Sequence, residues 1–150
     1  MSTKYKGQKR EVIALDTYIK LIRAAGTIRS KVINSLSKFQ LTENQFNCLD
    51  AIFHLGPLTQ KELGEKLLRS GGNITLVVDN LEKNSLVKRI RNENDRRKFF
   101  IHLTSKGEKL YKKVFPIQLK FLVEELGVIT EKDKKELQRI CKKIGKVGNF

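Results

Sequence analysis

The residues of this chain that are best suited to binding chemistry are basic side chains in the stretch NENDRRKFFIHLT, residues 92–104. Arg96 and Arg97 stand side by side among turn-forming polar residues, directly after Asp95. A guanidinium offers five N–H donors in a planar fork that matches a phosphate, and it keeps its charge at physiological pH. Phosphates repel a carboxylate, so we expect Asp95 to hold the Arg97 side chain by a charge-assisted hydrogen bond.

The composition of the whole chain also favours a polyanionic partner. The 150 residues include 31 Lys and Arg against 16 Asp and Glu, which gives a formal net charge of +15. This balance is typical of nucleic-acid binding and, as a second choice, of contact with an anionic membrane surface. No apolar run approaches the about 20 residues of a membrane span. The N-terminus MSTKYKGQKR lacks the apolar region of a secretory signal, so we expect a cytoplasmic protein that does not enter a membrane.

The sequence gives little support for catalysis or for a cofactor. The chain has two His and two Cys residues, and the cysteines lack metal-ligand spacing. We find neither a phosphate-cradling Gly loop nor a nucleophile next to a base, so we expect no enzyme, no cofactor and no metal. Cys48 and Cys141 lie among apolar residues of predicted helices, and we expect both to be inert small hydrophobes rather than reactive thiolates.

The elements that must position these arginines are mainly helical. Apolar residues at steps of three and four predict a long amphipathic helix over residues 12–37. A small domain cannot cover so long an apolar stripe, so a partner helix is expected. Two capping boxes, Thr42 with Gln45 and Thr59 with Glu62, begin two shorter helices.

A further helix is predicted over roughly residues 71–83, with Ser70 as its N-cap. Its inward face carries Ile74, Val77, Val78 and Leu81. The residues that then face outward are Asn73, Thr75, Leu76, Asn80 and Lys83. Asparagine can contact adenine through two hydrogen bonds, a threonine hydroxyl suits either partner, and leucine packs on a thymine methyl. Gly71 and Gly72 would let the start of the helix approach a phosphate closely.

Two strands are predicted next, over residues 86–91 and 98–103, with the tip of the hairpin between them. In the second strand Phe99, Ile101 and Leu103 alternate with Lys98, Phe100 and His102, and we expect the face of the first three to be buried. Ser105 and Glu108 resemble a third capping box that opens another helix, and Thr130 caps the last one. The order is therefore a long helix, three shorter helices, a hairpin and two helices.

Two helices joined by a short turn and followed at once by a hairpin have the order of a winged helix-turn-helix, whose second helix lies in the major groove of DNA. An arginine at the hairpin tip would enter the neighbouring minor groove. The other wing residues expected to contact the DNA backbone are Lys88, Arg89, Arg91, Arg96 and Lys98. The plainer alternatives are a polar surface helix with a solvated turn, and, for function, a non-specific architectural or RNA-binding protein.

The sequence resembles the MarR family of winged-helix transcriptional regulators. The segments that carry the resemblance are LTENQF (41–46), LTQKELGEKL (58–67), NITLVVDNLEKNSLVKR (73–89) and DRRKFFIHLTSKG (95–107). The wing pattern of the family, Asp-x-Arg followed by Leu-Thr-x-x-Gly, falls here on Asp95, Arg97, Leu103, Thr104 and Gly107. The family usually has Gly before LVKR. This chain has Ser85, and we expect the preceding Asn84 to adopt the left-handed conformation instead.

The resemblance implies a mainly α fold with a small β-hairpin. After a flexible basic arm (1–10), a single domain (11–150) would hold a winged-helix DNA-binding lobe (41–104) between dimerisation helices (11–38 and 117–150). It further implies a homodimer on a pseudo-palindromic site in double-stranded DNA, acting as a repressor that a ligand releases.

The resemblance also implies a small amphipathic or anionic effector, bound between the dimer helices and the lobe. Tyr18, Arg23, Phe53 and His54 are the candidates for lining such a site, although aromatic residues at helical spacing more often belong to a core. Another branch of the family senses hydroperoxides through a cysteine early in the first helix. No cysteine precedes Cys48 here, so that mechanism has no support.

Overall fold

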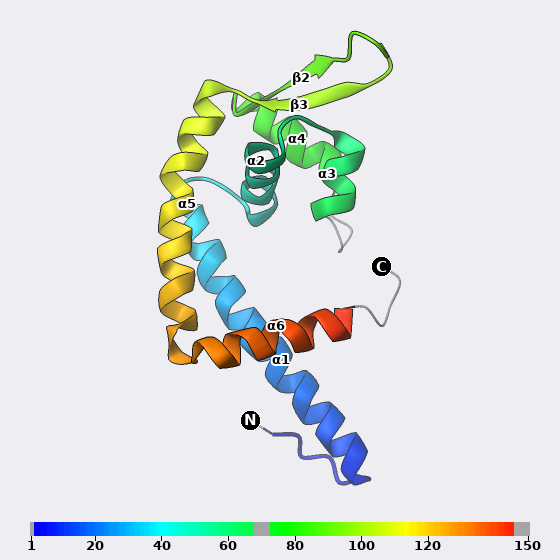
Figure 1. Cartoon of the computed structure of the whole chain (residues 1–150), viewed down its shortest axis with the longest axis vertical. Coiled ribbons are helices and arrows are strands. Elements are labelled where there is room, and N and C mark those ends of the chain that lie inside the picture. The colour runs from blue at the N-terminus through cyan, green and yellow to red at the C-terminus, as the bar shows by residue number, and fades with distance from the viewer. Residues whose placement is uncertain (1, 68–72, 146–150) are drawn as a thin grey trace.

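The computed structural model describes residues 2–67 and 73–145. Within them, six α-helices, one 3₁₀ turn and a three-stranded antiparallel sheet form the fold. Figure 1 shows a lobe of α2, α3, α4 and the sheet at one end, from which α1 and α5 lead away side by side. The mainly α fold with a small hairpin is confirmed. No described helix is long and apolar enough to cross a membrane.

The first two helices are α1, Lys9–Ser37, and α2, Glu43–Leu55. Helix α1 begins three residues before the predicted start, and Leu36 is its one buried residue. The predicted capping box of α2 is present. Thr42 Oγ1 accepts from the Gln45 N–H at 3.2 Å, and Gln45 Oε1 accepts from the Thr42 N–H at 2.9 Å.

Helix α3, Gln60–Leu67, also begins at its predicted capping box. The Thr59 N–H donates to Glu62 Oε2 at 2.8 Å, and the Glu62 N–H donates to Thr59 Oγ1 at 3.2 Å. Helix α4 starts later than predicted, at Ile74, and runs to Lys83. Its N-cap is Asn73, not Ser70, because Asn73 Oδ1 accepts from the Leu76 N–H at 3.3 Å.

A left-handed residue ends α4, and it is not the one that the sequence suggested. Ser85 has φ 59°, whereas Asn84 has φ −86°. The Leu86 N–H donates to the Leu81 carbonyl at 2.9 Å, and the Ser85 N–H donates to the Glu82 carbonyl at 2.8 Å. This pair of bonds is a Schellman motif, which requires the left-handed conformation one residue after Asn84.

The sheet contains the predicted hairpin and one short strand that was not predicted. Strand β1, Leu58–Thr59, pairs with β3, Phe99–Leu103, which pairs in turn with β2, Val87–Arg91. Ile101 of β3 lies opposite Leu58 and is fully buried, and Leu103 is partly buried. Phe99 was expected on the same buried face but is exposed, because it lies next to the hairpin tip, beyond the core.

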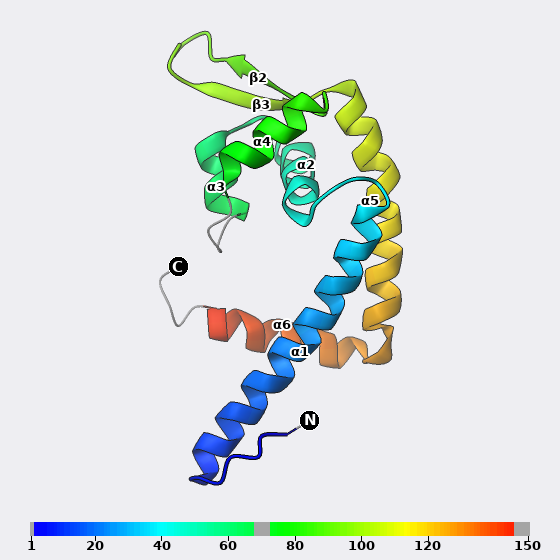
Figure 2. The same ribbon diagram turned by 180° about the vertical axis from the view of Figure 1, so that it is seen from behind.

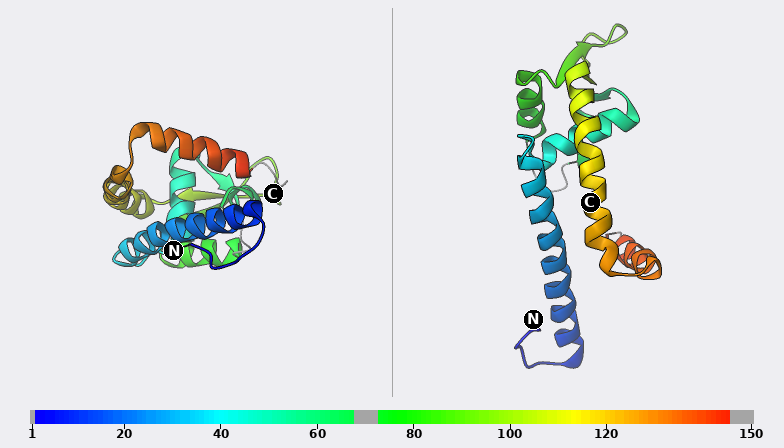
Figure 3. Two further views of the ribbon diagram at one scale, coloured as in Figure 1. Left: turned by 90° about the horizontal axis from the view of Figure 1, so that it is seen from below. Right: turned by 90° about the vertical axis from the view of Figure 1, so that its left-hand side faces the viewer.

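Helix α5 spans Ser105–Glu125, and α6 spans Glu131–Gly145 after the 3₁₀ turn Leu126–Val128. The N-cap of α5 is Thr104, not Ser105 as predicted, because Thr104 Oγ1 accepts from the Gly107 N–H at 3.0 Å. Thr130 caps α6 as predicted, accepting from the Asp133 N–H at 3.1 Å. The ribbons of α6 and α1 cross in Figures 1 and 2, but Figure 3 shows that the two helices lie apart.

The hydrophobic core lies in the lobe and along the upper part of α5. Its fully buried side chains include Leu36, Leu49, Leu63, Val78, Leu81, Val87, Ile101, Tyr111 and Val114. Helix α6 contributes no buried residue, and α1 contributes only its last turn. The core therefore fixes α4 and the wing in one lobe, while most of the apolar surface of α1 and α6 stays uncovered.

Candidate nucleic-acid interface

Helix α4 divides into the two faces that the sequence predicted. Val78 and Leu81 are buried. Ile74 and Val77 are half-buried against them. The exposed side carries Thr75, Leu76, Asn80 and Lys83. Figure 1 places α4 directly beneath the hairpin. Gly71 and Gly72, the two other residues predicted for this surface, lie outside the described residues. The face is short, polar and centred on an exposed leucine, which suits contact with base edges.

Asn73 is exposed, but its side chain already has a partner. Its Oδ1 caps α4 through the Leu76 N–H, which leaves the amide NH₂ for another contact. The predicted two-bond contact with adenine uses both the oxygen and the NH₂ group, so it would compete with the cap. A contact from Asn73 to DNA stays a prediction, and we expect its NH₂ group to be the donor.

Arg89 was predicted to contact phosphate, and the structure gives its guanidinium internal partners. Nη1 donates to Glu82 Oε1 at 3.1 Å, Nη2 pairs with Asp79 Oδ1, and the Arg89 N–H donates to Glu82 Oε2 at 3.0 Å. Partial burial lowers the pKa of Arg89, but the hydrogen bond to Asp79 and the charge of Glu82 outweigh it and raise that pKa above its usual value. Arg89 therefore ties β2 of the wing to α4.

Sequence reasoning missed Gln60, the first residue of α3. Its Nε2 donates to Thr75 Oγ1 at 2.6 Å, and its Oε1 accepts from Arg89 Nη2 at 3.4 Å. Gln60 thus joins the exposed face of α4 to the wing. No sequence pattern marks this role, because the two contacts span 15 and 29 residues of the chain.

The hairpin tip is organised by Asp95, though not in the predicted way. Its Oδ1 accepts from the main-chain N–H of Arg97 at 3.1 Å, and its Oδ2 lies 3.8 Å from Lys98 Nζ. The prediction that Asp95 holds the Arg97 guanidinium is wrong, because the short Asp side chain closes a local turn on the backbone. Arg96 and Arg97 are both exposed at this tip.

The wing and α3 enclose a basic hollow of about 290 Å³. It is lined by Thr59, Gln60, Arg89, Arg97, Lys98, Phe99 and Ile101. On the outer strand, the Arg91 guanidinium lies over the Phe99 ring, 5.2 Å from its centroid. This cation–π contact holds Arg91 along the hairpin. Three of the predicted wing cations, Arg89, Arg97 and Lys98, therefore line one hollow.

The four predicted effector residues do not meet in a single chain. Tyr18 and Arg23 are exposed on α1, whose N-terminal end lies away from the lobe in Figure 1. Phe53 and His54 lie at the end of α2, where His54 Nε2 is 2.9 Å from the Tyr111 hydroxyl and the Phe53 and Tyr111 ring centroids are 4.5 Å apart. The latter pair belongs to the contact between α2 and α5.

Tyr111 is the centre of that contact. Its hydroxyl donates to Asp50 Oδ1 at 2.6 Å. Burial of the ring raises the pKa of Tyr111, and the neighbouring Asp50 carboxylate raises it further. Of the two cysteines, Cys48 is fully buried, and burial raises the pKa of its thiol to about 12, as expected for an inert core residue. Cys141 is exposed on α6.

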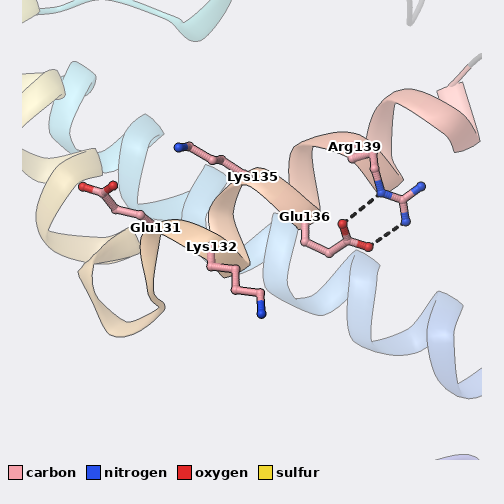
Figure 4. A pocket seen from close by; sticks show the side chains of 5 residues that line it. All are labelled: Glu131, Lys132, Lys135, Glu136 and Arg139. Carbon is pink, nitrogen blue, oxygen red and sulfur yellow. Dashed lines mark hydrogen bonds and ion pairs between the residues drawn. The ribbon is translucent and has the colours of Figure 1, made fainter.

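A second hollow lies along α6, and Figure 4 shows that charged side chains line it. They are Glu131, Lys132, Lys135, Glu136 and Arg139. Glu136 and Arg139 are paired by two hydrogen bonds, of 2.9 and 2.6 Å. Exposed pairs of this kind contribute little to stability, and every side chain that lines the hollow is charged.

Residues 41–99 match the model of the MarR family. The chain is 30% identical to the HTH-type transcriptional regulator MhqR of Bacillus subtilis over 132 residues, which covers 88% of this chain and 91% of the relative. It is 32% identical to an uncharacterized HTH-type transcriptional regulator of Bacillus cereus, with 86% of each covered.

Solved structures with the same fold include the MarR family transcriptional regulator AbsC from Streptomyces coelicolor. Its TM-score is 0.82 at 20% identity, with 96% of this chain and 97% of that one covered. The MepR–DNA complex of S. aureus gives a TM-score of 0.78 at 23% identity, with 87% and 98% covered.

Proposed function

Because this chain belongs to the MarR family of DNA-binding transcriptional regulators, we propose that it acts as a homodimeric, sequence-specific repressor. It would hold a pseudo-palindromic site in double-stranded DNA and release it when a small molecule binds.

The observation that carries the proposal is the placement of two unlike surfaces on one lobe. The exposed face of α4, with Thr75, Leu76 and Asn80, is shaped to reach base edges in a major groove. The hairpin beside it ends in Arg96 and Arg97, whose charges suit the narrow groove next to it. The solved MepR–DNA complex supports the same use of a chain with this fold.

The uncovered helices support a homodimer. Ile13, Leu15, Leu21 and Ile22 of α1 are exposed large hydrophobics. Leu137, Ile140 and Ile144 of α6 are likewise 44%, 40% and 52% exposed. Water-exposed apolar stripes of this size are typical of interfaces. The segments 11–38 and 117–150 would then be the dimerisation helices around the lobe at 41–104. A two-fold dimer would set its α4 helices about 34–36 Å apart, one turn of DNA.

The proposed ligand response depends on residues from two separate parts of the fold. Tyr18 and Arg23 of one chain lie on the dimer helix, and Phe53 and His54 lie in the lobe, so a site that joined them would need the second copy. An amphipathic or anionic molecule in such a place would contact both the dimer helices and the DNA-binding lobe. It could therefore change the spacing of the two α4 helices, on which operator binding depends.

Selection of binding sites from random duplexes tests this function. We expect one enriched site with two-fold symmetry and half-sites one helical turn apart. The double variant Arg96→Ala, Arg97→Ala removes the two cations of the hairpin tip. Selection with this variant should show no enrichment, while its mass in solution should stay that of a dimer. Uniform coating of DNA, or a preference for single strands, would instead favour the architectural or RNA-binding alternative.

A further inference from the structure

Gln60 lies between Arg89, whose side chain can only donate hydrogen bonds, and Thr75, whose hydroxyl can donate or accept. Its Oε1 lies 3.4 Å from Arg89 Nη2, and its Nε2 lies 2.6 Å from Thr75 Oγ1. A guanidinium has no acceptor, an amide has one acceptor end and one donor end, and a hydroxyl has one proton and two lone pairs. The chemistry of Arg89 therefore dictates which end of Gln60 faces it.

Arg89 is itself held in place. Two carboxylates of α4 accept from its guanidinium, Asp79 from Nη2 and Glu82 from Nη1, and its side chain is 24% exposed. The guanidinium is thus fixed with one Nη2 proton toward Gln60. The amide of Gln60 must turn its oxygen to Arg89, and its NH₂ group then faces α4.

The consequence reaches Thr75 on the exposed face of α4. Because Gln60 Nε2 donates to it, Thr75 Oγ1 accepts at this contact and its own proton must point elsewhere. We propose that Gln60 is a specificity-determining positioning residue, which sets Thr75 to donate a hydrogen bond to an acceptor on one base of the operator. This inference rests on the proposed function, since it needs α4 in the major groove.

A Thr75 hydroxyl that donates its proton suits only some base edges. In the major groove the acceptors are O6 and N7 of guanine, N7 of adenine and O4 of thymine, whereas the amines of adenine and cytosine are donors. A Thr75 hydroxyl that donates pairs with the first group. The same threonine without the polarity set by Gln60 would serve either group, so the sequence of α4 alone does not determine the preference.

We call the hydrogen bonds from Arg89 through Gln60 to Thr75 the relay. The variant Gln60→Glu keeps the shape of the side chain but reverses the direction of the hydrogen bond between residue 60 and Thr75. Both carboxylate oxygens accept, so one stays on Arg89 and the other accepts the Thr75 proton, which leaves only lone pairs on Thr75 for the base. We expect the preference at one position of the selected site to move from acceptor-bearing to amine-bearing edges by about three- to tenfold, the range of one net hydrogen bond.

Three further proteins make the measurement specific. Thr75→Val should flatten the preference at that same position and so identify it. In the Thr75→Val background, Gln60→Glu should change no position, because the two residues act as one unit. Asn94→Asp, at the hairpin tip, adds the same negative charge without touching the relay, and should weaken all sites alike. Thermal unfolding of each protein checks that the fold is kept.

The outcomes separate this inference from the function on which it rests. If the unmodified protein enriches no site, the proposed function fails. If it enriches a site but Gln60→Glu only weakens binding evenly, as Asn94→Asp does, the relay is overturned. A preference that Thr75→Val leaves unchanged at every position overturns it as well.

Discussion

Gly107 at the start of α5 lies against the backbone of Leu86, so closely that a Cβ on Gly107 would overlap the Leu86 carbonyl. The Thr104 hydroxyl, which caps α5, donates to the Ser85 carbonyl at 2.6 Å. Together the two residues fasten α5 to the turn that ends α4. The Leu-Thr-x-x-Gly pattern of the wing thus has a physical cause: a threonine bonds this turn, and a glycine makes room for it.

Gly107→Ala should therefore lower the free energy of unfolding, by about 1–3 kcal/mol, the usual cost of overpacking. Urea denaturation followed by circular dichroism measures it. Gly127→Ala is the matched control, because a Cβ there meets nothing within 4 Å and that variant should keep its stability. Equal behaviour of the two variants would contradict the close approach to Leu86.

Ser85→Gly should stabilise the protein. Ser85 adopts φ 59°, a conformation that costs an L-residue roughly 1–2 kcal/mol and glycine little, so we expect a gain of about 1 kcal/mol after the extra chain entropy. The comparison is Asn84→Gly, where φ is −86° and the bond from Asn84 Nδ2 to the Asn80 carbonyl would be lost. That variant should be less stable than the parent in the same urea titration, and the opposite ranking would refute the assignment.

Arg89 and Arg97 should affect DNA binding in different ways. Arg97 is exposed at the hairpin tip, so Arg97→Ala should weaken binding and, if one phosphate contact is lost, reduce the slope of log K against log salt by about 0.9. Arg89 is engaged by Asp79 and Glu82, so Arg89→Met should lower the thermal midpoint and the affinity without changing the slope. Filter binding from low to moderate salt measures both. A smaller slope for Arg89→Met would restore its predicted phosphate contact.

Tyr111 should make stability fall at alkaline pH. Its folded pKa is raised above the ordinary 10.0, so below pH 10 both states keep the proton and the contribution is complete. As pH rises through 10 the unfolded chain loses the proton first, and stability declines. Tyr111→Phe loses the bond to Asp50, about 1 kcal/mol at neutral pH, but lacks this decline. The difference in the free energy of unfolding between the two proteins should narrow above pH 10 in urea titrations. A difference that widens would show that folding lowers the pKa of Tyr111 instead of raising it.

Ile140→Glu with Ile144→Glu should convert the proposed dimer to a monomer. Both side chains lie on the uncovered apolar face of α6, and buried carboxylates would oppose association. Sedimentation equilibrium reports the mass directly. Lys143→Glu makes the matched change on the same helix at a residue that is already polar, and it should leave the mass of a dimer. If the double variant kept the dimer mass, α6 would not be the interface.

The sequence alone determined most of the local structure. The capping boxes at Thr42 and Thr59, the inward face of α4 and the two hairpin strands depend on residues a few positions apart, so their periods and hydrogen-bonding groups can be read from the chain. The same local logic failed where neighbouring residues compete for one role, as when Thr104 rather than Ser105 caps α5 and Ser85 rather than Asn84 becomes left-handed.

Only the tertiary structure decided which residues of the candidate interface pair with one another. The basic residues of the wing look alike in sequence, yet Arg89 is turned inward onto Asp79 and Glu82 while Arg97 stays exposed. Gln60 has partners on α4 and β2, and the Asp95 carboxylate accepts from the main-chain N–H of Arg97 in its own turn. The physical reason is that a charge or an amide binds whatever the fold brings within about 3 Å. That distance depends on packing between elements far apart in the chain, which no local pattern encodes.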